Sequence, residues 1–290
     1  MILVTGATGT VGRALLDRLL ASGQTVRAMS RRPEGADLPA AVHVVGADLG
    51  DPSTLPNALD GVERVFLLSR GPDGPQHDAH LSAAARDAGV TLIVKLSALT
   101  VGDETSHDPI TTWHRAGEQA VRDSGVAWTC LRPTGFMSNA LMWTDTVASH
   151  DTVYTPYGAG RTAVIDPDDI AAVAAAVLTT PGDGHAHQAY PLTGPEALSP
   201  AVQVDILAEV LGRPLRYIDV APQTAHEAMT EAGMPADVAE AVLALLATSL
   251  EPDAATVHPT VKKITRRTAG TFRDWARRHQ SAFTPSWASR

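Results

Sequence analysis

The sequence predicts an α/β fold, in which a doubly wound parallel sheet is followed by a smaller, mostly helical C-terminal lobe. Three observations support it. Short apolar runs alternate with helical patterns roughly every 20 to 25 residues. A glycine-punctuated turn joins the first apolar run to the first helix, and helical patterns separated by Pro and Gly follow Pro195. Strands that alternate with helices form parallel sheets covered on both faces.

Three glycines organise the first turn. The apolar run Ile2 to Val4 breaks at Gly6, and Gly9 and Gly12 follow before an amphipathic helix. In a Rossmann-type unit such glycines permit the turn, let phosphates approach the backbone and allow the helix to pack on the strand. Peptide N–H groups at the helix N-terminus would then bind a pyrophosphate, whereas a loop that only turns the chain is the alternative. The predicted cofactor contacts here are Gly6, Thr8, Gly9, Thr10, Val11 and Gly12.

The second strand, predicted over 25–29, is followed by Arg31 and Arg32. An NAD-binding unit carries an acidic residue near this point for the ribose hydroxyls. A guanidinium instead pairs bidentately with a phosphate, so the arginines predict the 2′-phosphate of NADP(H). Two surface arginines beside a turn are the alternative interpretation.

Further strands are predicted at 42–46, 65–69, 91–98 and 126–131. Loops at the carboxyl ends of parallel strands line the ligand crevice, so Leu68 and Ser69 are expected to cover the cofactor. Lys95 and Ser97 lie two apart on one strand face, at the end expected near the nicotinamide. The remaining predicted elements are helices over 109–123, 166–178, 201–211, 224–232, 236–250 and 270–279, and a strand over 188–193.

We assign residues 1–150, continued by about 166–195, to an NADP-binding Rossmann domain. Residues 196–290, with about 151–165, form the predicted substrate-binding lobe. A monomer and a homodimer are both open.

Composition excludes several classes of protein. No stretch approaches the roughly 18 uncharged apolar residues of a membrane span, and the early glycine motif argues against a secretory signal. The net charge of −9 opposes nucleic-acid binding. The single cysteine, Cys130, allows no disulfide framework, so we expect a cytoplasmic protein with a small-molecule substrate. We expect no metal, because His77 and His80 lack a nearby ligand set.

His114 and Glu118 lie one turn apart on the predicted helix 109–123. A histidine titrating near the working pH is a candidate general acid, which Glu118 would orient. An ordinary helix-surface pair, extended by Arg122, is the alternative.

The opening Thr5-Gly6-Ala7-Thr8-Gly9 resembles the short-chain dehydrogenase/reductase superfamily. That superfamily usually uses Ser with Tyr-x-x-x-Lys, and here His114 and Glu118 stand in place of the Tyr/Lys pair. A wider set of motifs resembles the NmrA-like atypical reductases over about residues 1 to 280. The set comprises Lys95-Leu96-Ser97, His114, Glu118, Ser124-Gly125, Trp128-Thr129, Leu131-Arg132-Pro133, Phe136-Met137, Asn139, Ile165-Asp166, Asp169-Ile170-Ala171 and Tyr190-Pro191.

That family includes NADPH-dependent quinone, azo-dye and triphenylmethane reductases, as well as redox-sensing regulators. The resemblance implies an NADPH-dependent oxidoreductase transferring hydride to a small conjugated carbonyl compound, quinone-like or a secondary metabolite. It places Asp48 and Leu49 beside the adenine and Lys95 near the cofactor. A non-catalytic NADP(H) sensor controlling a partner protein and a non-redox isomerase or dehydratase are the alternatives.

Ser97, His114 or Asn139 would polarise the substrate oxygen. Asn139 is alternatively a helix N-cap. Side chains expected either to stack on a flat substrate or to pack the lobe are Trp113, Phe136, Met137, Met142 and Trp143.

Overall fold

The computed structural model describes residues 1–284, which form two compact units. The first unit combines residues 1–133, 167–192 and 260–267. The second combines residues 134–166, 193–259 and, within the described residues, 268–284. The first unit therefore ends at 133 rather than near 150, and the segment 260–267 returns to it. The last six positions of the predicted lobe, 285–290, lie outside the described residues.

A seven-stranded sheet with the order β3-β2-β1-β4-β5-β6-β8 forms the centre of the first unit. Every neighbouring pair is parallel. The order reverses between β1 and β4, which confirms the predicted doubly wound topology. In sheets of this kind ligands bind outside the carboxyl ends of the strands, next to the reversal. The strands are β1 Ile2–Val4, β2 Val26–Ser30, β3 His43–Gly46, β4 Arg64–Leu67, β5 Leu92–Leu96, β6 Ala127–Pro133 and β8 Gln188–Leu192.

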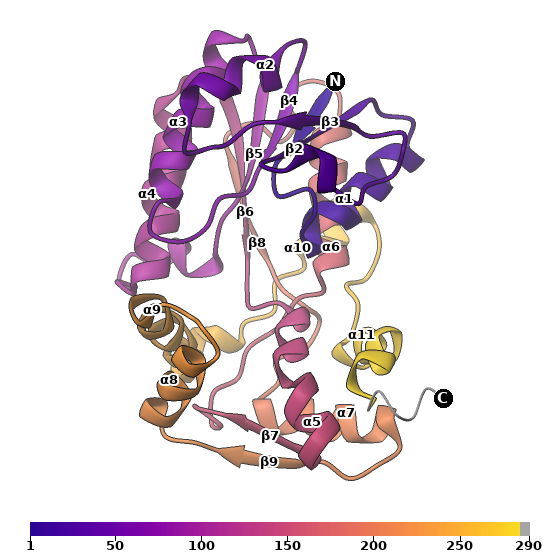
Figure 1. Ribbon diagram of the computed structural model, residues 1–290, viewed down its shortest axis with the longest axis vertical. Helices are drawn as coiled ribbons and strands as arrows, with labels where there is room; N and C mark the ends of the chain where they lie inside the picture. The colour runs from indigo at the N-terminus through magenta and orange to yellow at the C-terminus, as the bar shows by residue number, and fades with distance from the viewer. Residues whose placement is uncertain (285–290) are drawn as a thin grey trace. The chain divides into compact units, whose positions relative to one another are not determined.

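Helices cover both faces of this sheet (Figure 1). One face carries α2 (Leu55–Leu59), α3 (Gly74–Asp87) and α4 (Pro109–Asp123), and the other carries α1 (Thr10–Ala21), α6 (Pro167–Thr179) and α10 (Thr260–Thr265). Short 3-10 turns lie at η1 Pro33–Gly35, η2 Pro52–Thr54 and η3 Leu99–Gly102.

Helix α4 begins and ends at the predicted residues. The Asp108 side chain accepts a hydrogen bond from the N–H of Thr111 at 2.9 Å, and Pro109 occupies the first helical position. The first N–H groups of a helix have no intrahelical acceptor. Asp at the N-cap accepts from one of them, and Pro at the first position has no N–H that needs an acceptor, so both residues favour a helix start here.

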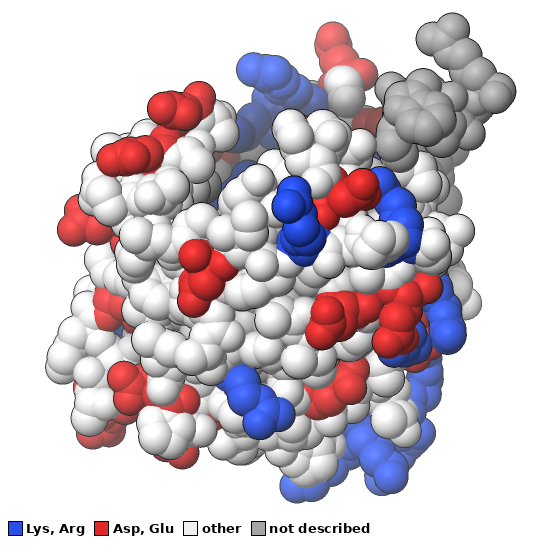
Figure 2. Space-filling view, turned by 90° about the horizontal axis from the view of Figure 1, so that it is seen from below, with Lys and Arg blue, Asp and Glu red and all other residues white. Residues whose placement is uncertain are grey.

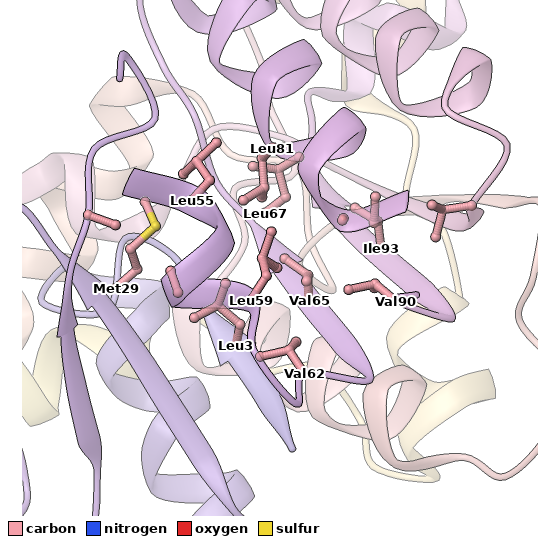
Figure 3. Close-up of a cluster of buried hydrophobic side chains, with 14 of the residues drawn as sticks. Leu3, Met29, Leu55, Leu59, Val62, Val65, Leu67, Leu81, Val90 and Ile93 are labelled. Carbon is pink, nitrogen blue, oxygen red and sulfur yellow. The ribbon is translucent and has the colours of Figure 1, made fainter. Parts of the chain in front are cut away.

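The core on the α2–α3 side of the sheet is aliphatic (Figure 3). Leu3, Val65 and Ile93 come from three neighbouring strands and have no exposed surface. They pack with Leu59 of α2 and Leu81 of α3. Strands buried on both faces read as continuous apolar runs, which is why the sequence located them well.

The second unit contains most of the predicted helices and one feature that the sequence did not predict. Strands β7 and β9 pair in parallel as a separate two-stranded sheet. Each has four residues, too few for a clear alternation, and the pairing joins distant parts of the chain. The helices and strands of the second unit are η4 Met137–Trp143, α5 Thr144–His150, β7 Thr152–Thr155, α7 Pro200–Leu211, β9 Arg216–Asp219, α8 Pro222–Glu231, α9 Ala236–Ala247, η5 Thr248–Leu250, η6 Pro252–Ala255, α11 Phe272–His279 and η7 Gln280–Phe283.

The core of the second unit surrounds Trp275, which is 1% exposed. Its ring stacks on Phe272 at a centroid distance of 5.5 Å and meets Phe283 edge-on. Met137 belongs to the same buried cluster, and Trp143 packs partly against it. Two roles were predicted for these side chains, stacking on a substrate or packing the lobe. The position of Met137 agrees with packing.

Charged side chains of both signs are scattered over the face shown in Figure 2. Uncharged atoms separate them, so the described residues present no broad basic patch on this face. Within residues 1–284, none of the helices has both the length and the apolar character that crossing a bilayer requires. The same residues contain no group of three or more His, Cys, Asp or Glu side chains arranged to hold a metal ion.

Candidate cofactor and active site

The glycine turn between β1 and α1 is fixed by hydrogen bonds to β4. The Thr5 hydroxyl lies 3.2 Å from the carbonyl oxygens of Phe66 and Leu68 and accepts from the N–H of Leu68 at 2.7 Å. Gly6 has a φ of +61°, which L side chains rarely adopt. A Cβ at Gly12 would overlap the carbonyl oxygen of Gly6. The helix can therefore pack this closely on the turn only because residue 12 is glycine.

The N-terminus of α1 is suited to an anion. Among the residues that the structure describes, no side chain caps it, and its first turn contains no acidic residue. Thr8, Gly9 and Thr10 are exposed, while Val11 is buried against the core. The first N–H groups of a helix have no intrahelical acceptor and carry a partial positive charge. A helix start of this kind is suited to an anion, and its role as the pyrophosphate site stays a prediction.

Basic side chains flank the turn. Arg31 and Arg32 are exposed directly after β2, and the N–H of Arg32 donates to the Ser30 hydroxyl at 3.1 Å. Arg13, which was not predicted as part of this region, donates from its Nε to the carbonyl oxygen of Thr8 at 3.2 Å. Its position one helical turn after Gly9 is the signal that could have identified it.

The Asp48-Leu49 segment follows β3 in a tight turn. Asp48 Oδ1 accepts from the N–H of Gly50 at 2.9 Å, and the Asp48 N–H donates to the Thr54 hydroxyl at 3.0 Å. The Leu49 carbonyl oxygen lies 2.8 Å from His80 Nδ1. One carboxylate oxygen of Asp48 thus serves its own turn, and both Asp48 and Leu49 remain half-buried.

Leu68 and Ser69 follow β4 beside the glycine turn. Leu68 is half-buried, and its Cδ2 lies 3.3 Å from the position that a Cβ on Gly6 would take. Ser69 is 7% exposed, and its hydroxyl lies 3.5 Å from Lys95 Nζ.

Lys95 does not fit the predicted contact with the cofactor. Its side chain has no exposed surface, and its Nζ lies 2.7 Å from Oδ2 of Asp78, which is 1% exposed. A Cβ at Gly117 of α4 would overlap Asp78 Oδ2. Asp78 on α3 and Gly117 on α4 therefore pack against the end of the Lys95 side chain, and the ion pair with Asp78 compensates the buried charge.

Ser97 and Glu118 come together at the carboxyl end of β5. The Ser97 hydroxyl donates to Glu118 Oε1 at 2.7 Å, and Arg132 binds the same carboxylate through Nε at 2.8 Å and Nη2 at 2.7 Å. Burial raises the pKa of Glu118, but the hydrogen bonds from Arg132 and Ser97 outweigh it and leave the pKa below its ordinary value. The pair on the helix is therefore neither exposed nor built around His114. Arg132 belongs to the motifs named above, but its pairing with Glu118 was not predicted.

His114 is half-buried on α4. Burial and the neighbouring Lys95 ammonium lower its pKa to about 4, against the opposing effect of Glu118. Such a histidine is neutral at pH 7, which corrects the expectation of a histidine titrating near the working pH. Glu118 does not orient it through a hydrogen bond, since the acceptor positions of that carboxylate are occupied by other residues.

Asn139 lies in η4 of the second unit and is exposed. Its N–H donates to the carbonyl oxygen of Phe136 at 3.0 Å, within the 3-10 turn. Met142 in the same turn is 65% exposed, so it is available to a ligand in a way that Met137 is not.

The comparisons with known proteins settle the family. A sequence model of the NAD(P)H-binding family matches residues 6–181 of the chain. The chain belongs to the NAD(P)H-binding family. The match begins at Gly6 of the glycine turn and extends through α6, so it includes most of the first unit.

Two relatives of this NAD(P)H-binding protein are similar over nearly their whole length. The (4-alkanoyl-5-oxo-2,5-dihydrofuran-3-yl)methyl phosphate reductase of Streptomyces griseus is 45% identical over 286 residues, covering 98% of this chain and 100% of that protein. The NAD(P)H azoreductase of Xenophilus azovorans is 40% identical over 286 residues, covering 98% and 99%. The NADPH-dependent quinone oxidoreductase of Escherichia coli, solved with NADPH, has a TM-score of 0.84 at 26% identity, covering 95% and 98%.

The predicted resemblance to the NmrA-like atypical reductases is confirmed. The protein is an NADPH-dependent reductase, and NADPH is its confirmed cofactor. The roles of individual residues toward cofactor and substrate stay predictions.

Proposed function

We propose that this reductase uses NADPH to reduce a small carbonyl compound whose carbonyl group is conjugated with a C=C bond, as in an enone, a butenolide or a quinone. This choice is supported by the poor ability of three candidate side chains to donate a proton. The Ser97 hydroxyl donates to Glu118, His114 is neutral at pH 7, and Lys95 is enclosed with Asp78. None of the three supplies a proton readily to a substrate oxygen.

The chemistry of the acceptor follows from that observation. Bound NADPH supplies a hydride to the substrate. An isolated ketone then becomes an alkoxide, which requires a positioned acid, whereas a conjugated acceptor gives a delocalised anion that water can protonate. Positioning of the reactants therefore provides most of the rate acceleration.

The chain's own residues bind and orient the cofactor. We assign the pyrophosphate to the glycine turn and the α1 N-terminus, and the 2′-phosphate to Arg31 and Arg32 with Arg13 nearby. Asp48 and Leu49 are assigned to the adenine, and Leu68 and Ser69 to the cover over the cofactor. Asn139 is assigned as hydrogen-bond donor to the substrate carbonyl, and the second unit as the part that selects the substrate.

The names of the relatives support a conjugated acceptor. The Streptomyces griseus name describes a dihydrofuranone ring whose C=C bond is adjacent to both the ring carbonyl and an alkanoyl group. The other two name an azo compound and a quinone as the acceptor class. All three acceptors delocalise an added electron pair. A phosphorylated butenolide is accordingly the first compound to test.

The experiment is NADPH oxidation measured with matched pairs of acceptors. Each pair consists of a conjugated compound and its saturated counterpart. The pairs are a 4-alkanoyl butenolide with the corresponding butyrolactone, an enone with the corresponding ketone, and a quinone with the corresponding cyclic diketone. We expect turnover with at least one conjugated member and none with its partner. Turnover of saturated ketones at comparable rates would contradict the proposal, as would NADPH binding without turnover across the panel.

A further inference from the structure

Four hydrogen-bond donors surround the carboxylate of Glu118. Oε1 accepts from Ser97 Oγ and Arg132 Nε, and Oε2 accepts from Arg122 Nη2 at 2.9 Å and Arg132 Nη2 at 2.7 Å. An ionised carboxylate offers about four lone-pair positions. All of them are occupied, and the Glu118 side chain is 2% exposed.

The two arginines determine which group is the donor in the hydrogen bond between Ser97 and Glu118. Arg132 holds both carboxylate oxygens in a fork, and the Arg122 guanidinium lies 4.4 Å from the centroid of the Trp128 ring. A guanidinium can only donate hydrogen bonds, and the ionised carboxylate can only accept them. The Ser97 hydroxyl must therefore donate its single proton to Glu118, and only its oxygen lone pairs remain for another partner.

Ser97 is held where a nicotinamide is expected. It directly follows β5, and its N–H donates to the Leu131 carbonyl oxygen on β6 at 2.7 Å. Beyond the switch point between β1 and β4, strands β4 to β6 form the half of the sheet that takes the second mononucleotide of a dinucleotide. With adenosine on the glycine-turn half, that second mononucleotide carries the nicotinamide. Its carboxamide N–H group is a donor that needs an acceptor.

We propose that Ser97 accepts a hydrogen bond from the carboxamide N–H of the bound nicotinamide, and that Glu118 is the positioning residue that fixes this polarity. The proposal rests on the NADP(H) binding of the proposed function and refines it. It replaces the sequence-based expectation that Ser97 polarises the substrate carbonyl, since that role needs the hydroxyl proton that Ser97 already donates to Glu118.

The test compares two cofactors that differ in this one donor. In the 3-acetylpyridine analogue of NADP⁺, an acetyl group replaces the carboxamide, so the carbonyl remains and the N–H is lost. Dissociation constants for NADP⁺ and the analogue would be measured by calorimetry with wild type, Ser97→Ala and Glu118→Gln. Ser22→Ala serves as a control, because among residues 1–284 the partner of the Ser22 hydroxyl is the Leu19 carbonyl oxygen at the end of α1.

We expect Ser97→Ala to weaken NADP⁺ binding about fivefold, as for one neutral hydrogen bond, and to change analogue binding less than about twofold. Ser97→Thr keeps the oxygen and should retain the discrimination. In Glu118→Gln the side-chain amide can donate as well as accept, so the polarity is no longer fixed and the discrimination should shrink. Thermal unfolding of each variant reports whether the fold is retained.

An equal loss for both cofactors in Ser97→Ala would overturn the proposal. Unchanged binding of both with reduced turnover would also overturn it, because Ser97 would then act on the substrate. Failure of the proposed function looks different: wild type binds NADP⁺ with discrimination against the analogue but oxidises NADPH with no conjugated acceptor.

Discussion

Replacing Lys95 with methionine should destabilise the protein by about 3–5 kcal/mol. The ammonium and the Asp78 carboxylate lie 2.7 Å apart, with 0% and 1% of their side chains exposed. Among the residues described, Asp78 Oδ1 has no hydrogen-bond partner, so Lys95 is the principal compensation for this carboxylate. Methionine keeps the length of the side chain, and the loss therefore measures the buried charge that is left unpaired.

A second substitution distinguishes the unpaired charge from a packing defect. In the double variant Lys95→Met/Asp78→Leu both charges are gone, and replacing a buried pair with apolar residues is often neutral. We expect it to recover at least about 2 kcal/mol relative to the single variant, and the Asp78→Leu single variant completes the cycle that gives the coupling energy of the pair. Arg86→Met is the control, since the exposed Arg86–Asp87 pair should contribute less than about 1 kcal/mol.

The assay is urea denaturation followed by far-UV circular dichroism and tryptophan fluorescence, with free energies compared only where the two transitions coincide. A Lys95→Met variant within about 1 kcal/mol of wild type would refute the reasoning. A double variant less stable than the single one would refute it as well, because the site would then depend on shape rather than charge.

Three further predictions concern the cofactor and the acid–base groups. Gly12→Ala should weaken NADP⁺ binding roughly tenfold or more in calorimetry, because its Cβ would force the turn to shift, whereas Gly35→Ala has open space and should not. Arg31→Asp should weaken NADPH binding about 10- to 100-fold and spare NADH; equal losses, or the same effect in Arg86→Asp, would exclude a 2′-phosphate contact. Because the pKa of His114 is about 4, kcat should show no histidine titration between pH 6 and 8, and His114→Gln should leave that profile unchanged; a break near pH 6.5 lost in the variant would contradict this.

The fold was predictable because its signals are local. Leu3, Val65 and Ile93 lie in apolar runs that are buried on both faces, and Asp108 with Pro109 marks the start of α4. The glycine turn is also a local signal, because its three glycines lie at a fixed spacing within one short stretch. The β7–β9 pair was missed because its four-residue strands carry no clear period and pair across a long separation.

The site was predictable only where its parts adjoin in sequence. Lys95 and Ser97 do share a strand, but Lys95 turns to Asp78 on α3 and Ser97 to Glu118 on α4. Neither pairing has a sequence signal, because it depends on how the helices pack on the sheet. The short spacing between His114 and Glu118 suggested a partnership that Arg132, from the next strand, prevents.

The most direct measurement of the central claim is deuterium transfer from NADPH labelled at the reactive C4 position to a 4-alkanoyl butenolide or an enone. We expect a saturated product with one deuterium at the β-carbon, and a proton at the α-carbon that comes from solvent. Deuterium at the carbonyl carbon of an allylic alcohol would contradict it, because such a product requires an acid for the alkoxide that Ser97, His114 and Lys95 do not readily provide.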